Sequence, residues 1–482
     1  MTDSLRPDRS SDGYESARAE AEKAAYHAKR AEVDRKRGLN RGAKPLGFKT
    51  EAPSLVGRVV AGSPKDDPIS VSIPDPLSPV IRVTRPRGLR PPVQLLPSVV
   101  SPPLVVQRDT FEGEPVYRVD IEAEGDSLWM EEALYLCRSD FKATELVKPT
   151  GLGTSGSYFV SNREFQSIAI LKPLDEELGA LRSKRKDIVM AKEGIVPGTS
   201  GFREVVAGKI FSDLVPPTGL VTTSHLYFSY NPDKEGFQAV KQCSIQKFIP
   251  GTKEVLLLDD KEKPTLLTHL SPIVMIDICL VNSDRHAGNL MAKTAEGVVS
   301  EVFPIDHGCI LPDNLATGGT FFWFGIIDPA AKFSYEEQQR IRGLDLDEIA
   351  LQLAIIPDSS GAINTCVTGV LLAKTLCQTN PMKEIAFYFI DGPESCKSLA
   401  YFILMISALR QNPEIDFKEH PFPQVSPEMI QSVIRDITSF IAEKSSGKGG
   451  FSVHGKVREV LHRCMLTGKR EELLSGEWKG QI

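Results

Sequence analysis

The sequence predicts an α+β protein with two lobes: a small β-rich lobe that carries one key helix, and a larger, mostly helical lobe. A disordered N-terminal region is expected to precede them. Short strand patterns bounded by turn residues cluster within residues 151–250. Apolar residues at helical spacing dominate from Asp345 onward. A polar and proline-rich stretch comes before both, and such a composition does not support a packed core.

The chain divides by composition into five parts. Residues 1–50 are polar and include a helix-prone stretch rich in Ala, Glu and Lys. Residues 51–106 hold 12 of the 34 prolines, so we expect a disordered, extended linker there. We expect residues 107–150 to pack on the small lobe, in a role that the sequence does not indicate. The small lobe then occupies residues 151–250, and the large lobe occupies residues 251–482.

Composition also restricts the class of protein. The net charge of −6 and the isoelectric point near 5.9 argue against recruitment of nucleic acid by bulk electrostatics. The eight cysteines show neither ligand nor disulfide spacing, which is typical of reduced thiols in the cytoplasm. The longest apolar stretch, residues 399–409, is too short to span a bilayer and predicts a core helix. We therefore expect a cytoplasmic protein without a signal peptide or transmembrane segment, and peripheral contact with a membrane stays open.

The run Gly151-Leu-Gly-Thr-Ser-Gly156 has the G-x-G-x-x-G pattern, which occurs in dinucleotide-binding folds and in other phosphate loops. A dinucleotide site would continue from the third glycine into a helix. Residues 157–160 and 167–171 instead predict two strands joined by the turn-like Ser161-Asn-Arg. Asp175 could act as the ribose-binding acid of a dinucleotide site, but no predicted helix separates it from the glycines. The pattern favours a hairpin that covers phosphates with backbone N–H groups and small hydroxyls.

A lysine on the second strand and a glutamate on the following helix form a candidate pair. Lys172 ends the strand pattern, and Pro216-Pro217 is expected to stop the helix. Glu204 lies beside an apolar stripe at helical spacing, formed by Phe202, Val205, Val206 and Ile210. A lone lysine or glutamate is usually solvated. The occurrence of both in this order predicts an ion pair that holds the lysine at a phosphate.

Two further elements lead to the most distinctive motif of the chain. Residues 242–249 predict a strand that runs into an extended linker at Pro250-Gly251. Residues 266–281 carry Leu, Ile and Val at helical spacing. They predict a long helix that delivers the chain into a polar loop.

That loop reads Asn282-Ser-Asp-Arg-His-Ala-Gly-Asn289, and after one short predicted strand it is followed by Pro304-Ile-Asp-His-Gly308. Asp284 precedes Asn289 by the Asp-to-Asn spacing of the protein-kinase catalytic loop. Phosphoryl transfer from ATP needs one carboxylate that orients the attacking hydroxyl. It also needs an Asn oxygen and a second carboxylate that hold Mg²⁺. Asp284, Asn289 and Asp306 supply this set.

With these motifs the chain resembles the catalytic domain of the phosphatidylinositol 3-/4-kinase superfamily, nearest to the type II phosphatidylinositol 4-kinases and their plant gamma-type branch. Asp-Arg-His followed by Asp-His-Gly favours this superfamily over protein kinases. The segments that carry the similarity are residues 156–159, 171–177, 202–207, 282–289 and 304–308. The resemblance implies a bilobal protein-kinase-like fold. Position 307 departs from many relatives, because it is His where they have Phe.

The resemblance implies ATP and Mg²⁺ as cofactors, with Mn²⁺ as an alternative ion. Asp284 would be the catalytic acid/base, acting with Lys172 and Asn289, while Asn289 and Asp306 would bind the metal. The residues expected to contact ATP are Gly153, Ser155, Gly156, Ser157, Lys172, Glu204, Gln246, Lys247 and Phe248. Arg285 and His286 match the motif without an assigned role. For Arg285, pairing with a nearby carboxylate is as plausible as a catalytic role.

We expect phosphorylation of the inositol ring of a phosphoinositide, and two alternatives stay open. The same fold could phosphorylate protein Ser/Thr, but no Ala-Pro-Glu follows Asp306 to form the peptide platform of protein kinases. The chain could also be a nucleotide-binding scaffold without catalysis, although every catalytic position is filled. The expected partners are ATP and a lipid, with peripheral membrane contact and no nucleic acid, and the sequence does not indicate protein partners.

The aromatic run Phe321-Phe-Trp-Phe324 follows residues 304–308, the candidate metal-binding turn (the metal turn below). In a kinase, the segment at this place meets the substrate. Such runs usually pack in a core. Alternatively, some of these rings could face outward and enter the headgroup region of a membrane.

Overall fold

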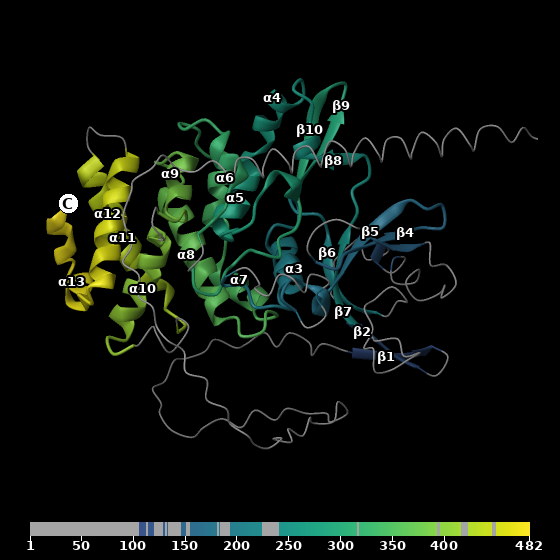
Figure 1. Ribbon diagram of the computed structural model, residues 1–482, viewed down its shortest axis with the longest axis horizontal. Coiled ribbons are helices and arrows are strands. Elements are labelled where there is room, and N and C mark those ends of the chain that lie inside the picture. The colour runs from purple at the N-terminus through teal and green to yellow at the C-terminus, as the bar shows by residue number, and fades with distance from the viewer. Residues whose placement is uncertain are drawn as a thin grey trace, which may run out of the picture. The chain divides into compact units, whose positions relative to one another are not determined.

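The computed structural model describes the chain from Val106 to Ile482 with internal gaps. The described residues are 106–111, 114–119, 129–130, 133, 146–150, 155–180, 183, 193–223, 241–315, 318–392, 396–415, 423–445 and 450–482. The predictions for residues 1–50, for the linker up to residue 105, and for Gly153 lie outside this part. Within it the fold is α+β, as predicted (Figure 1).

A five-stranded antiparallel sheet forms the core of what we call the small lobe, together with helix α3. The strand order is β3-β4-β5-β7-β6. The strands are β3 (Val147–Pro149), β4 (Tyr158–Ser161), β5 (Ser167–Pro173), β6 (Thr218–Thr223) and β7 (Lys241–Lys247). A separate hairpin pairs β1 (Val106–Phe111) with β2 (Glu114–Val119). The strands expected on either side of the Ser161 turn are confirmed.

Alternation along β5 positions the candidate lysine. Ala169 and Leu171 are fully buried in the apolar core on one face of the sheet. Because successive side chains of a strand point to opposite faces, Lys172 lies on the other face. The register pairs Phe159 with Ile170, so an aromatic ring shares that face with Lys172. This face of the sheet therefore places the Lys172 cation beside apolar side chains.

Helix α3 (Ser200–Ile210) is the key helix of the small lobe, and it packs against β6, β7 and α7 (Leu346–Leu353). Figure 1 shows it between the sheet and the helices of the large lobe. The helix ends at Ile210, well before Pro216-Pro217. A turn follows it, in which the N–H groups of Leu214 and Val215 both donate to the carbonyl of Phe211. The prolines therefore follow a turn and do not terminate the helix itself.

Most of the large lobe is helical. Its longer helices are α5 (Ser271–Cys279), α6 (Tyr335–Gly343), α8 (Ser360–Leu376), α10 (Leu399–Gln411), α11 (Pro427–Ser445) and α12 (Gly450–Leu466). Shorter helices are α9 (Met382–Phe387) and α13 (Arg470–Ser475). The core helix predicted at residues 399–409 is confirmed by the burial of α10. No helix among the described residues is long and apolar enough to cross a membrane.

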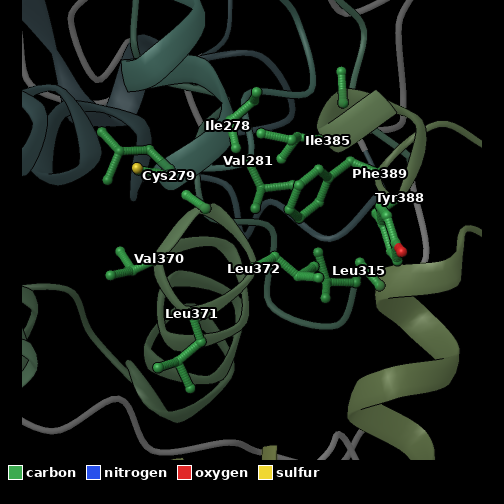
Figure 2. Close-up of a cluster of buried hydrophobic side chains, with 14 of the residues drawn as sticks. Ile278, Cys279, Val281, Leu315, Val370, Leu371, Leu372, Ile385, Tyr388 and Phe389 are labelled. Carbon is green, nitrogen blue, oxygen red and sulfur yellow. The ribbon is translucent and has the colours of Figure 1, made fainter. Parts of the chain in front are cut away.

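The core of the large lobe lies where α5 meets α8 and α9. Figure 2 shows Cys279 of α5, Leu372 of α8 and Ile385 of α9 gathered there with other buried side chains. The two long helices approach closely at Gly369, where a Cβ atom would lie 2.5 Å from the carbonyl oxygen of Cys279. This packing fixes the C-terminal end of α5, which is followed by residues 282–289, the candidate catalytic loop.

Two predictions for this region are wrong in detail. The long helix expected over residues 266–281 is divided into α4 (Lys263–Leu266), a 3-10 turn, and α5, which has a proline in its first turn. The single strand expected before the metal turn is a hairpin of β9 (Leu290–Ala295) and β10 (Val298–Pro304), extended by β8 (Thr252–Glu254). Its loop, Glu296-Gly297, has positive φ at both positions, and glutamate there is not a usual hairpin signal.

Candidate active site

A buried ion pair joins the candidate catalytic loop to helix α5. Arg285 is fully buried, and its Nε donates to both carboxylate oxygens of Asp277 on α5, at 3.0 and 3.1 Å. Asn282 and Trp323 also donate to this carboxylate, at 3.0 and 2.9 Å. The guanidinium therefore has a structural role, and the sequence did not identify Asp277 as its partner.

Backbone hydrogen bonds join the catalytic loop to the metal turn on both sides of the candidate acids. The N–H of Ser283 donates to the carbonyl of Cys309 at 3.0 Å, and that of Ile305 donates to the carbonyl of Asn289 at 3.0 Å. Arg285 adds bonds from Nη1 to the carbonyls of Asn289 and Ile305, at 2.8 and 2.7 Å. Asp284 and Asp306 thus lie on two neighbouring segments that are tied together at both ends.

The oxygen atoms at this junction fit a magnesium ion. The Asn289 amide nitrogen donates to the carbonyl of Asp284 at 3.1 Å, which orients the amide and leaves its oxygen out of that bond. The Asp306 side chain is half exposed, at 51 %, on a residue with a φ of 56°. No group of three or more His, Cys, Asp or Glu side chains suited to a metal occurs among the described residues. Magnesium bound with a nucleotide needs few protein ligands, because phosphates and water complete its shell.

Lys172 brings the sheet, helix α3 and the metal turn together. Its Nζ lies 2.6 Å from Oε1 of Glu204 and 3.1 Å from Oδ1 of Asp306. Burial alone would lower the pKa of Lys172, but these two carboxylates raise it above its ordinary value. Burial raises the pKa of Glu204 to about 7, against the opposing effect of Lys172. Lys172 in turn lowers the pKa of Asp306. The predicted lysine–glutamate pair is therefore present.

The described residues on either side of the glycine-rich segment are held by backbone hydrogen bonds. The N–H of Thr150 donates to the carbonyl of Ser157 at 2.9 Å, and that of Gly156 donates to the carbonyl of Glu176 at 3.1 Å. Ser155 and Ser157 are half-buried beside it. A Cβ atom on Gly156 would lie only 2.3 Å from Oε2 of Glu176.

Glu176 is the centre of a buried polar cluster that sequence reasoning missed. Its carboxylate accepts from the Tyr158 hydroxyl at 2.7 Å and from Nζ of Lys241 at 2.6 Å. The neighbouring Glu177 accepts from the first backbone N–H groups of α3, at Ser200 and Gly201. The sequence signal for this cluster was the Asp-Glu-Glu run at residues 175–177. The partners of these acids lie too far along the chain for residue spacing to reveal them.

The residues of strand β7 and its following linker that are expected to contact ATP make hydrogen bonds within the sheet. Gln246 donates from its side chain to Thr218 at 2.9 Å. The N–H groups of Lys247 and Phe248 donate to the carbonyls of Pro217 and Ile168, at 2.8 and 2.9 Å. The Phe248 ring meets the edge of Phe159 at a centroid distance of 6.0 Å. Apolar ring surfaces are thus present, and the role of these three residues toward ATP stays a prediction.

Two histidines flank the candidate metal ligands differently. His286 accepts the N–H of Gly288 at its Nδ1, at 3.1 Å, and so caps the short turn that ends at Asn289. His307 is fully buried, and neither ring nitrogen has a hydrogen-bond partner among the residues that the structure describes. Burial lowers the pKa of His307 well below its ordinary value, so this ring is neutral.

The aromatic run after the metal turn packs in the core. Trp323 is fully buried and stacks on Phe321 at a centroid distance of 4.8 Å, so the membrane-facing interpretation is wrong for this side chain. Phe322 and Phe324 are partly buried against the same core. The N–H of Phe322 donates to the carbonyl of Arg285 at 2.8 Å, which ties the run to the catalytic loop.

The described end of the glycine-rich segment, the Lys172–Glu204 pair and the two tethered acidic loops together form the candidate nucleotide site. The family model described as "Phosphatidylinositol 3- and 4-kinase" matches residues 154–337, which contain the candidate site, so the predicted resemblance to this superfamily is confirmed. The curated proteins similar to this chain include several plant proteins named as gamma-type phosphatidylinositol 4-kinases. Phosphatidylinositol 4-kinase gamma 6 of Arabidopsis thaliana is 33 % identical over 220 residues, which cover 41 % of this chain and 35 % of that protein.

Two other relatives extend the similarity along the chain. Phosphatidylinositol 4-kinase gamma 1 of Arabidopsis thaliana is 29 % identical over 279 residues, covering 52 % of this chain and 48 % of its own length. Phosphatidylinositol 4-kinase gamma 4 of Oryza sativa subsp. japonica is 26 % identical over 315 residues, covering 61 % and 52 %. The chain thus spans about a third to a half of the length of these relatives.

Proposed function

We propose that this protein is an ATP- and Mg²⁺-dependent phosphotransferase that phosphorylates the inositol ring of a phosphoinositide. The observation that carries the proposal is the position of Lys172, which contacts Glu204 of the small lobe and Asp306 of the metal turn at once. Kinases of this general design need a lysine held by a helix-borne acid next to a metal-binding carboxylate.

Each residue then has a role. Lys172 would hold ATP phosphates while Glu204 keeps its ammonium in place. The oxygens of Asn289 and Asp306 would hold Mg²⁺, which when bound supplies charge neutralisation at the phosphates. Asp284 would accept the proton of the attacking hydroxyl. Its backbone is held by the N–H bond to the Asn282 side chain at 2.9 Å. Catalysis would consist mostly of positioning and electrostatic stabilisation.

The lipid substrate is favoured by the superfamily and by the printed names of the relatives, which make phosphatidylinositol and its 4-hydroxyl the first substrate to test. The protein-kinase alternative lacks an Ala-Pro-Glu platform after Asp306. Contact with a membrane surface is part of this proposal, since the substrate is a membrane lipid. A cytoplasmic location is likewise proposed.

The test is a transfer assay with labelled ATP on liposomes that contain phosphatidylinositol and its monophosphates, with a generic protein substrate in parallel. We expect label in the lipid, dependence on Mg²⁺ and no label with Asp284→Asn. Label only in protein would favour the Ser/Thr kinase alternative. Nucleotide binding without transfer to either substrate would favour a non-catalytic scaffold.

A further inference from the structure

Arg203 is adjacent to Glu204 on α3 and is also fully buried, but it points to a different part of the protein. Its Nε donates to Oγ1 of Thr199 at 3.2 Å, and its Nη2 donates to Oδ1 of Asp313 at 2.8 Å. Its Nη1 donates to the carbonyl of Ile310 at 3.0 Å and also to the carbonyl of Leu311. One guanidinium therefore joins α3 to residues 310–313, directly after the metal turn.

The segment that Arg203 holds is strained and closely packed. Leu311 is fully buried with a φ of 52°, a conformation that a leucine rarely adopts without support from its surroundings. Its N–H donates to the carbonyl of Leu280 at 2.8 Å, just before the catalytic loop. Gly308 lies against Ser200 of α3, where an added Cβ atom would be 2.8 Å from the Ser200 Cβ.

Helix α3 is thus attached at three places that matter for the proposed chemistry. Glu177 binds its first N–H groups, Glu204 binds Lys172, and Arg203 binds the segment after Asp306. The last contact needs a planar group with several donors, because three backbone or carboxylate oxygens surround it. Lysine has the charge but cannot reproduce this fork.

We propose that Arg203 is a positioning residue that sets the distance between the Lys172–Glu204 pair and the Asp306 carboxylate. Movement of α3 away from the metal turn would break these bonds and separate the phosphate-binding cation from the metal ligand. This inference rests on the proposed function, since it concerns the same site. Arg203 would act on the nucleotide and the metal only indirectly, through Lys172, Glu204 and Asp306.

The test compares Arg203→Lys with Arg458→Lys. Arg458 is a matched control, because it is also buried, donates to the carbonyl of Ile390 at 2.9 Å, and lies over the Phe387 ring in the C-terminal part of the fold. We expect Arg203→Lys to lower kcat by about tenfold to a hundredfold and to raise the half-saturating Mg²⁺ concentration by about tenfold. Arg458→Lys should lower the melting temperature without changing either kinetic quantity of the folded protein.

A milder variant covers the case in which Arg203→Lys does not fold. Asp313→Asn removes one charged partner from the guanidinium and keeps the side-chain shape. It should shift the Mg²⁺ dependence in the same direction by a smaller factor. If neither variant changes kcat or the Mg²⁺ dependence beyond the effect of Arg458→Lys, Arg203 is only a stabilising residue and the proposal is wrong.

A binding measurement separates this inference from the proposed function. ATP should raise the melting temperature of the wild-type protein more with Mg²⁺ than without it, and Arg203→Lys should lose the Mg²⁺-dependent part. A wild-type protein that does not respond to ATP and Mg²⁺ would overturn the proposed function together with the inference. A full Mg²⁺-dependent response in Arg203→Lys would overturn the inference alone.

Discussion

Gly156 in the glycine-rich loop lies directly against Glu176, which is fully buried, and a methyl group at position 156 would be 2.3 Å from the glutamate Oε2. The same glutamate accepts the N–H of Gly156 through its backbone carbonyl. Glu176, which follows β5 in the chain, therefore holds the described end of the proposed phosphate loop through both its backbone and its side chain.

Gly156→Ala should displace this loop, because neither the backbone nor the hydrogen-bonded carboxylate of Glu176 can move away cheaply. We expect kcat/KM for ATP to fall by about a hundredfold, the effect of a displacement near 1 Å. Steady-state kinetics at varied ATP would measure it. Gly343→Ala is the control, since an added Cβ there meets nothing within 4 Å. Unchanged kinetics in Gly156→Ala would show that the loop does not bind ATP.

Lys172→Met and Asp306→Ala should each abolish phosphoryl transfer and leave the protein folded. Loss of either charge removes electrostatic stabilisation at the phosphates, for which a decrease of about 10³-fold is expected. Activity and circular dichroism would be measured on the same preparations. Lys469→Met removes an ion pair of equal length, 2.6 Å to Glu472, near the C-terminus and should not affect activity. Near-normal turnover in Asp306→Ala would show that the metal site is wrongly assigned.

Arg285→Met should destabilise the protein strongly, because it leaves the buried Asp277 carboxylate without its cation. We expect the free energy of unfolding to fall by about 3–5 kcal/mol. Arg410 and Asp436 form a partly exposed pair at 2.8 Å, and Arg410→Met should cost less than about 1 kcal/mol. Denaturant unfolding of both variants would measure the difference. Similar small losses would contradict a structural role for Arg285 under the catalytic loop.

His307→Phe should raise the free energy of unfolding by about 1 kcal/mol, since it removes two buried nitrogen atoms that have no hydrogen-bond partner in the described part of the chain. The phenyl ring has a similar size and shape, so the metal turn should keep its conformation and the protein its activity. Thermal unfolding and a transfer assay would check both. A large loss of activity with unchanged stability would instead assign the His307 ring a direct role at the site.

Much of the candidate site could be predicted from the sequence because its signals are local. The spacing of Asp284, Asn289 and Asp306 within two short loops predicted phosphoryl transfer, and this stays a prediction. The two-residue period of β5 placed Lys172 on one face, and the apolar stripe of α3 placed Glu204 beside it. In each case the residues that carry the signal lie within one strand, one helix or two loops close together in the sequence.

Other features were decided only by the tertiary structure. Asp277 and Trp323 are separated by 46 residues, Glu176 and Lys241 by 65, and Arg203 and Asp313 by 110. No periodicity or motif connects positions so far apart. The carbonyls that accept the N–H groups of Lys247 and Phe248 are likewise determined by which strands lie beside β7. The sequence by itself determined which groups the proposed chemistry uses. Packing decided how they are held, because a buried charge or N–H must find its partner wherever the fold places one.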